Sequence, residues 1–162
     1  MIFASQNRRN NHLEVCMKFI FVLFSAFVLF SQCHGTRPKI LGVQSERLTS
    51  CPKTPNCISS FSAEDDTIHF KSPLKYKKPL SEAKAILKSR IESHPRTEIV
   101  SENPNYIYAE FTSLIMRYVD DVEFYFDEKT KLLHFRSASR LGKGDLGVNR
   151  KRIETLLKDL DI

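Results

Sequence analysis

The sequence has 162 residues, of which 25 are lysine or arginine and 19 are aspartate or glutamate, giving a formal net charge of +6. This length is enough for one domain with a modest hydrophobic core. The lysines are scattered among acidic residues, and no dense basic run alternates with aromatic residues, which excludes an extended nucleic-acid-binding surface.

The first element in chain order is an apolar run, Phe19–Phe30, interrupted by a single serine. It follows Lys18 and precedes small and polar residues, a pattern typical of a secretory signal that covers residues 1–35. Its twelve residues are fewer than the roughly twenty that a membrane-spanning helix needs. Met17 is a more natural start than Met1, which would leave residues 1–16 untranslated. The segment therefore predicts export to the periplasm or cell envelope.

Two kinds of processing fit the residues that follow the apolar run. Small residues allow cleavage by a general signal peptidase near His34 or Thr36. The stretch Phe30–Cys33 also resembles a bacterial lipobox, in which Cys33 would become the lipidated first residue. Two positions depart from the usual lipobox pattern, which favours a soluble exported protein over a lipid-anchored one. Without the first 35 residues, which hold three basic and one acidic side chain, 127 residues remain with 22 basic and 18 acidic side chains.

Residues 36–60 lack hydrophobic periodicity and contain three prolines, so we predict an extended arm that wraps onto a domain formed by residues 61–162. Cys51 and Cys57 lie in this arm. In an oxidising compartment, two such cysteines are expected to form a disulfide. Their spacing is wider than in a zinc knuckle or a redox motif, and the mature chain has no second cysteine pair, so we predict neither a metal site nor a cofactor.

The domain is expected to begin with a strand-like segment, Thr67–Phe70, and an extended segment, Pro73–Tyr76. Apolar residues at helical spacing then predict a helix over Ser81–Ser93. Ser81 is the predicted N-cap of this helix, and Pro95 ends it.

Three segments rich in β-branched and aromatic residues follow and predict strands at Thr97–Ser101, Tyr106–Ser113 and Asp120–Phe126. Lys131–Ser139 is predicted to form a fourth strand, in a hairpin with the third. Helical spacing of apolar residues predicts a last helix over Leu146–Leu160. The predicted fold is therefore α+β: an antiparallel sheet of about four strands, two helices packed on one face, and the extended N-terminal arm.

Charged residues lie within the third and fourth predicted strands. Since side chains alternate between the faces of a strand, Asp121 and Glu123 share one face, and Arg136 and Arg140 share the corresponding face of the partner strand. Exposed opposite-charge pairs contribute only roughly 0.2–1 kcal/mol each, so stability alone explains the cluster poorly. The cluster is expected to form an internal salt-bridge network or, alternatively, a polar pocket.

The last predicted helix begins with basic residues, including Arg150, although cations oppose the macrodipole at a helix N-terminus. Negative charge is expected to compensate them, either from the strand carboxylates or from an external carboxylate, phosphate or lipid headgroup. The predicted anion-binding site has three arginines, two carboxylates that orient them, and one aspartate that fixes the preceding loop. These residues are Arg136, Arg140, Arg150, Asp121, Glu123 and Asp145.

Four segments together resemble the domain-of-unknown-function family 1499 (DUF1499). They are Cys51–Cys57, Val119–Phe124, Arg136–Arg140 and Asp145–Glu154, and the resemblance extends over residues 51–160. The family occurs in bacterial envelope proteins and in some plastid proteins. The resemblance therefore implies an exported single domain, and it implies no particular activity.

The sequence favours a binding or structural role over catalysis. Asp121 and Glu123 have the residue types of a glycoside hydrolase pair, but neighbouring arginines are expected to lower both pKa values and leave no proton donor. Ser137 and Ser139 lie near His134 in sequence but lack the glycine pattern of a nucleophile elbow. No catalytic residue is assigned, and a binding or structural module is favoured.

The sequence also fits two alternative functions. One is a hydrolase acting on an envelope ester or glycan, and the other is a module that binds an envelope protein through the arm or through a sheet edge.

Overall fold

The computed structural model of the protein describes Lys18 and residues 34–162. Residues 1–17 and 19–33, which form nearly all of the predicted signal segment and include the lipidation candidate Cys33, lie outside the described residues. Residues 34–162 form one compact unit. Across the part of the chain that the structure describes, no helix is both long enough and apolar enough to cross a bilayer.

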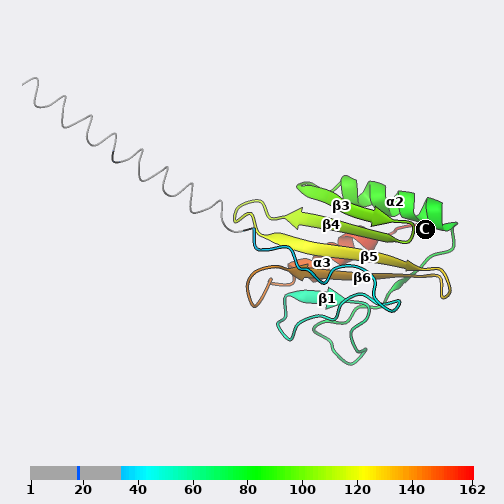
Figure 1. The fold of residues 1–162 in the computed structure, drawn as a ribbon, viewed down its shortest axis with the longest axis horizontal. Coiled ribbons are helices and arrows are strands. Elements are labelled where there is room, and N and C mark those ends of the chain that lie inside the picture. The colour runs from blue at the N-terminus through cyan, green and yellow to red at the C-terminus, as the bar shows by residue number, and fades with distance from the viewer. Residues whose placement is uncertain (1–17, 19–33) are drawn as a thin grey trace, which may run out of the picture. The chain divides into compact units, whose positions relative to one another are not determined.

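Six antiparallel strands form one sheet in the order β1-β6-β5-β4-β3, with β2 also paired to β6 (Figure 1). The strands are β1 (Cys57–Ser59), β2 (Leu74–Lys75), β3 (Thr97–Asn103), β4 (Tyr106–Thr112), β5 (Val119–Asp127) and β6 (Leu132–Ser139). The four predicted strands correspond to β3, β4, β5 and β6. The expected number of about four was too low because β1 and β2 have only three and two residues, too few for a periodic pattern.

The prediction of a strand-like segment at Thr67–Phe70 is wrong. Only Phe70 forms an isolated bridge, which pairs it with Ser59. The segment is a turn because the backbone N–H groups of His69 and Phe70 both donate to the carbonyl of Asp66. The Asp66 side chain stabilises the turn by accepting hydrogen bonds from the backbone at positions 68 and 69.

The helices α2 (Leu80–Glu92) and α3 (Val148–Leu157) pack on the same face of the sheet (Figure 1). The prediction of Ser81 as N-cap is wrong: the helix begins one residue earlier because the carbonyl of Pro79 accepts the first helical hydrogen bond. α3 begins later than predicted because Leu146 and Gly147 have φ angles of 54° and 76°, in the left-handed region.

The main hydrophobic core lies between these helices and the sheet. One stripe of each helix is buried, namely Ala83, Leu87 and Ile91 of α2, and Ile153 and Leu156 of α3. The strands contribute every second residue, as the alternation predicted, and Val122, Phe124 and Phe126 of β5 are all fully buried. This face of the sheet is therefore mainly apolar.

The opposite face of the sheet is covered by the N-terminal arm. Figure 1 shows this segment, in blue and cyan, crossing the sheet on the side away from α3. A second, smaller hydrophobic cluster forms there, in which Leu48 of the arm packs with Tyr106, Tyr108 and Tyr125 of β4 and β5. The arm also supplies β1, which extends the sheet beyond β6. The arm thus both covers and widens the sheet.

Candidate functional site

The strand register brings the predicted charged residues together beneath the arm. Glu123 of β5 lies opposite Arg136 of β6, and Glu110 of β4 lies directly opposite Asp121 of β5. Two carboxylates in such a cross-strand pair repel each other unless a cation lies between them. Arg140, just beyond β6, supplies that cation.

Arg140 binds both of these carboxylates. Its Nε lies 3.0 and 3.1 Å from the two carboxylate oxygens of Asp121, and its Nη2 donates to Asp121 Oδ1 at 2.7 Å and to Glu110. The Arg140 side chain is only 6% exposed. Burial alone would lower the pKa of Arg140, but the hydrogen bonds to Asp121 and Glu110 outweigh it and raise this pKa. The Nε and Nη2 groups of Arg140 thus both bind partners within the protein.

Two donors of the arm complete the network. Arg37 Nε donates to Glu110 at 2.6 Å, and the backbone N–H of Gly42 donates to Glu123 at 2.7 Å. The arm cluster, as we call it, therefore has three carboxylates, three guanidiniums and two phenols, and its formal charges balance. Its members are Glu110, Asp121, Glu123, Arg37, Arg136, Arg140, Tyr106 and Tyr108.

Glu123 is the most deeply buried member, with no solvent exposure. Burial raises the pKa of its carboxyl, although hydrogen bonds from Gly42 and Tyr106 and the charge of Arg136 oppose the shift. The expectation that neighbouring arginines would lower this pKa is therefore wrong for Glu123. Arg136 Nη1 lies 3.4 Å from Glu123 Oε2, and the effect of burial on the pKa outweighs that of this long ion pair. The Nε of Arg136 is buried and has no hydrogen-bond partner among the described residues.

Asp145 and Arg150 lie apart from the other four predicted ligands. The Asp145 carboxylate accepts hydrogen bonds from the backbone N–H groups of Gly147 and Asn149, at 2.9 and 2.8 Å, and supplies negative charge at the start of α3. The Nη2 of Arg150 lies 2.9–3.2 Å from three carbonyl oxygens in the turn at residues 67–70. Of the six predicted site residues, the structure brings together Arg136, Arg140, Asp121 and Glu123.

A second polar cluster lies on the helix face of the sheet, around Asn149 of α3, which is 1% exposed. Its Oδ1 accepts hydrogen bonds from Ser137 Oγ and Arg152 Nη1, both at 2.6 Å. Its Nδ2 lies within hydrogen-bond distance of three oxygens, from Asn56, Ser139 and Asp145. Sequence reasoning missed Asn149, because asparagine side chains are mostly exposed in folded proteins.

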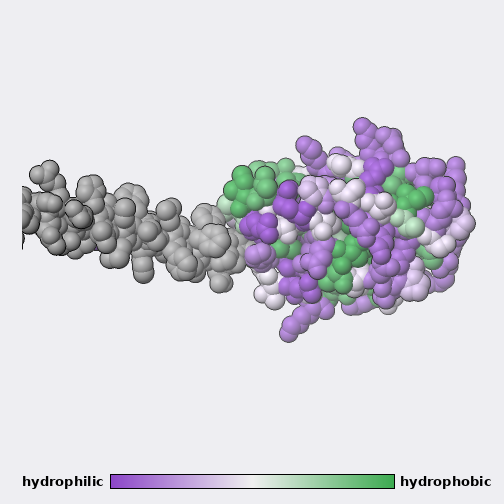
Figure 2. All heavy atoms as spheres, turned by 90° about the horizontal axis from the view of Figure 1, so that it is seen from above, coloured by the Kyte–Doolittle hydropathy of each residue, from purple (hydrophilic) through white to green (hydrophobic). Residues whose placement is uncertain are grey.

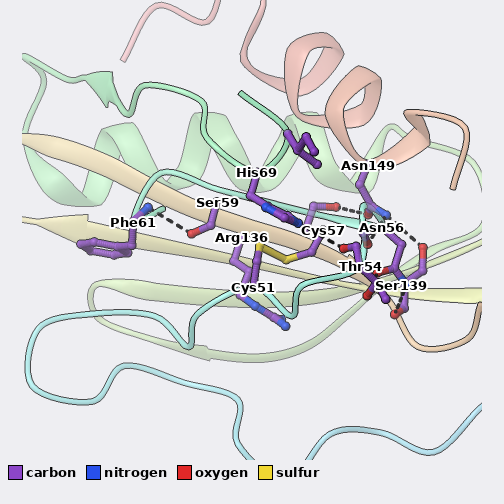
Figure 3. The surroundings of a disulfide bond; sticks show 12 residues. Cys51, Thr54, Asn56, Cys57, Ser59, Phe61, His69, Arg136, Ser139 and Asn149 are labelled. Carbon is purple, nitrogen blue, oxygen red and sulfur yellow. Dashed lines mark hydrogen bonds between the residues drawn. A yellow bond between two sulfur atoms is a disulfide. The ribbon is translucent and has the colours of Figure 1, made fainter. Parts of the chain in front are cut away.

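The disulfide loop is joined to this second cluster (Figure 3). Cys51 and Cys57 are bonded, as predicted. Within the loop, Asn56 Nδ2 donates to the carbonyl of Gly142 at 2.9 Å, and the Asn56 carbonyl accepts from the backbone N–H of Ser139 at 3.0 Å. The loop therefore holds the end of β6 and the connection that leads to α3.

Replacing both cysteines with serine is expected to lower the free energy of unfolding by about 2 kcal/mol, because the bridge closes a short loop. Urea unfolding of the double variant measures this loss. The wild-type protein in reductant should show the same lowered midpoint, whereas the double variant should not respond to reductant. An unchanged midpoint in the variant would show that the hydrogen bonds of Asn56 hold the loop without the bridge.

The groups considered for catalysis are engaged in structural contacts. His134 stacks on Phe61 with ring centroids 4.1 Å apart, and its Nδ1 lies 3.0 Å from Ser60 Oγ. Burial lowers the pKa of His134. Ser137 and Ser139 bond to Asn149 on the other face of the sheet, so His134 cannot activate either hydroxyl. Among residues 34–162 and Lys18, no group of three or more histidine, cysteine, aspartate or glutamate side chains could hold a metal ion.

Comparison with protein families identifies the family to which the chain is similar. A family model described as "Protein of unknown function (DUF1499)" matches residues 47–160, which include all six strands and both described helices. No curated protein matches the chain.

Proposed function

The chain belongs to the DUF1499 family, and from this membership and the geometry of the arm cluster we propose that it is an exported, envelope-associated domain that acts as a binding or structural module rather than as an enzyme. One observation carries the proposal: the charges of the carboxylates and guanidiniums in the arm cluster balance, these groups bind one another, and the arm covers them.

Export is supported by the sequence before the domain and by the cysteines within it. An apolar run after Lys18 has the length and position of a secretory signal. The Cys51–Cys57 disulfide is of the kind that persists in oxidising compartments and is rare in the cytosol. Together these features favour the periplasm or cell envelope.

A non-enzymatic role is supported by the hydrogen bonding and burial of the carboxylates in the arm cluster. Each of the three in the arm cluster accepts hydrogen bonds from protein donors, and Glu123 has no solvent exposure. A hydrolase needs a proton donor that contacts substrate. The raised pKa of Glu123 is the one property that fits the alternative of an ester or glycan hydrolase, but substrate would reach this group only if the arm moved away.

A narrower candidate function is binding of an anion at Arg136. This arginine is 9% exposed in its side chain and forms one long ion pair, with Glu123, while its Nε has no partner among the described residues. A carboxylate, phosphate or lipid headgroup could accept a hydrogen bond from that nitrogen. Glu123 would then orient the guanidinium, and Arg140 would remain part of the structural network.

Native mass spectrometry tests the proposal on protein purified gently from the envelope fraction of its own host. The same sample is then measured under denaturing conditions. We expect the denatured mass of a chain without its signal segment and with Cys51 and Cys57 oxidised. A chain found in the cytosol instead of the envelope fraction, or one that keeps its signal segment or two free thiols, would contradict the proposal.

The native spectrum distinguishes the two candidate roles. A reproducible extra mass that is lost on denaturation identifies a noncovalent ligand. If Arg136 binds it, the mass should disappear in Arg136→Met and persist in the matched variant Arg150→Met, which removes a guanidinium outside the arm cluster. A spectrum without extra mass supports a structural role for the arm cluster.

A further inference from the structure

One end of the domain carries most of its exposed hydrophobic side chains. Of the ten large hydrophobic residues that are exposed in the described part of the chain, seven lie in or next to the β4–β5 and β6–α3 loops. They are Leu114, Ile115, Met116, Tyr118, Leu141, Leu146 and Val148. Ile115 is 79% exposed, and Leu146 is completely exposed. We call these two loops and their hydrophobic residues the apolar end.

The two loops lie side by side. The strand ends that carry the two loops are neighbours, because the C-terminal ends of β4 and β6 both lie beside the N-terminal end of β5. The backbone N–H of Arg140 donates to the carbonyl of Val119 at 3.2 Å. Figure 1 shows both loops at the same end of the sheet, and Figure 2 shows hydrophobic residues gathered at that end. Single exposed hydrophobic residues are ordinary, but a contiguous group marks an interaction surface.

The N-terminal segment joins the domain at the apolar end. A Cβ atom built on Gly35 would lie 2.9 Å from the Cβ of Arg140 and 3.1 Å from the Cγ of Leu141, so the chain passes directly beside the β6–α3 loop. Gly35 lies only five positions after the end of the apolar run Phe19–Phe30. Five extended residues span at most about 18 Å. Any anchor in or just after that run is thus attached at the apolar end.

The charges of the apolar end favour a negatively charged surface. Arg117 and Lys143 are exposed between the hydrophobic residues, and neither forms an ion pair with any described residue. The single acidic residue of the two loops, Asp145, is engaged in capping α3. Hydrophobic side chains flanked by free cations are typical of segments that lie at the interface of an anionic membrane.

We propose that the apolar end docks on the surface of a bilayer that contains anionic lipids. Leu114, Ile115 and Leu146 insert among the headgroups, while Arg117 and Lys143 lie over lipid phosphates. This docking is independent of the arm cluster, which lies beneath the arm and does not use these residues. It orients the domain so that the far end of the sheet, with the β3–β4 and β5–β6 turns, faces away from the membrane.

Tryptophan fluorescence tests the docking, since the chain contains no tryptophan of its own. The variants Ile115→Trp and Leu146→Trp place one reporter in each loop, and Glu128→Trp is the control at the opposite end of β5. Each full chain is produced in its own host, purified as processed there, and mixed with phosphatidylcholine vesicles with or without phosphatidylglycerol.

Both loop reporters should shift to shorter emission wavelength on the anionic vesicles and lose emission when the lipids carry bromine on their acyl chains. The control reporter should do neither. Vesicle binding without a response of the loop reporters would overturn the proposal, because another part of the chain would then contact the lipids. A shift that depends on protein concentration and needs no vesicles would also overturn it, in favour of contact with a second copy of the chain.

Discussion

Replacing Arg140 with methionine is expected to lower the free energy of unfolding by about 3–5 kcal/mol, the usual cost of leaving a buried charge without its partner. The guanidinium lies between Glu110 and Asp121, which face each other across β4 and β5. Methionine fills a similar volume but carries no charge, so the two carboxylates would repel each other in a buried site. Urea unfolding followed by circular dichroism measures the loss.

The matched control is Arg37→Met, which removes the other guanidinium that pairs with Glu110. The side chain of Arg37 is 53% exposed, so water screens its charge and the loss should be much smaller. Equal losses in the two variants would show that Arg140 acts as a surface charge. If Arg140→Met kept the wild-type free energy of unfolding but lost a bound anion, Arg140 would be identified as the residue that binds the anion.

The effect of Arg140→Met should depend on pH. Burial raises the pKa of Glu110, but hydrogen bonds from Arg37, Tyr108 and Arg140 outweigh it and lower this pKa in the wild type. A lowered carboxyl pKa contributes stability above the pKa of the unfolded chain, and this stability is lost as the pH falls through the folded pKa. The difference between wild type and variant should therefore shrink on acidification. A constant difference would exclude Glu110 as the cause.

The second large effect is expected at Asn149, on the opposite face of the sheet. Asn149→Leu should lower the free energy of unfolding by at least about 3 kcal/mol, because several buried polar groups lose their hydrogen-bond partner at once. Leucine has the same branching as asparagine, but its methyl groups are larger than the amide atoms, so crowding adds to the loss of the hydrogen bonds. Thermal or urea unfolding measures it.

Ser139→Ala is the matched control for this position. It removes one acceptor of Asn149 and leaves the contacts with Ser137, Arg152 and Asn56 in place. The expected loss is about 1 kcal/mol, that of one ordinary hydrogen bond. If Asn149→Leu were no more destabilising than Ser139→Ala, the cluster around Asn149 would be dispensable and its burial incidental.

Because side chains alternate between the two faces of a strand, the sequence could predict both the existence of β5 and β6 and the face of the sheet on which each side chain lies. The pattern placed Asp121 and Glu123 on one side and Phe124 on the other, and the register confirms both assignments. The same reasoning could not find β1 or β2, because two or three residues carry no period. It also could not find the role of Glu110, which follows from the pairing of β4 with β5 and from the path of the arm.

The same alternation of side chains predicted the directions of some residues of the candidate site but not of others. Arg136 and Arg140 lie on a strand or directly after it, so alternation fixes their direction. Arg150 lies in the first turn of α3, where its long side chain reaches carbonyls in a turn about eighty residues earlier in the chain. No local pattern indicates such a contact. Asp145 is predicted to fix the loop, and its carboxylate accepts hydrogen bonds from backbone N–H groups at the start of α3.

The pairing of β6 has a consequence for the order in which the chain can fold. This strand, Leu132–Ser139, pairs with β1, β2 and β5, and the arm's bonds from Arg37 and Gly42 reach partners 73 and 81 positions later in the chain. Long sequence separations between contacts slow folding, because the intervening chain must be ordered first. The sheet cannot form completely until β6 is available to pair with its neighbours. Under the export that we propose, the chain therefore completes its fold only after all of it has left the translocation channel.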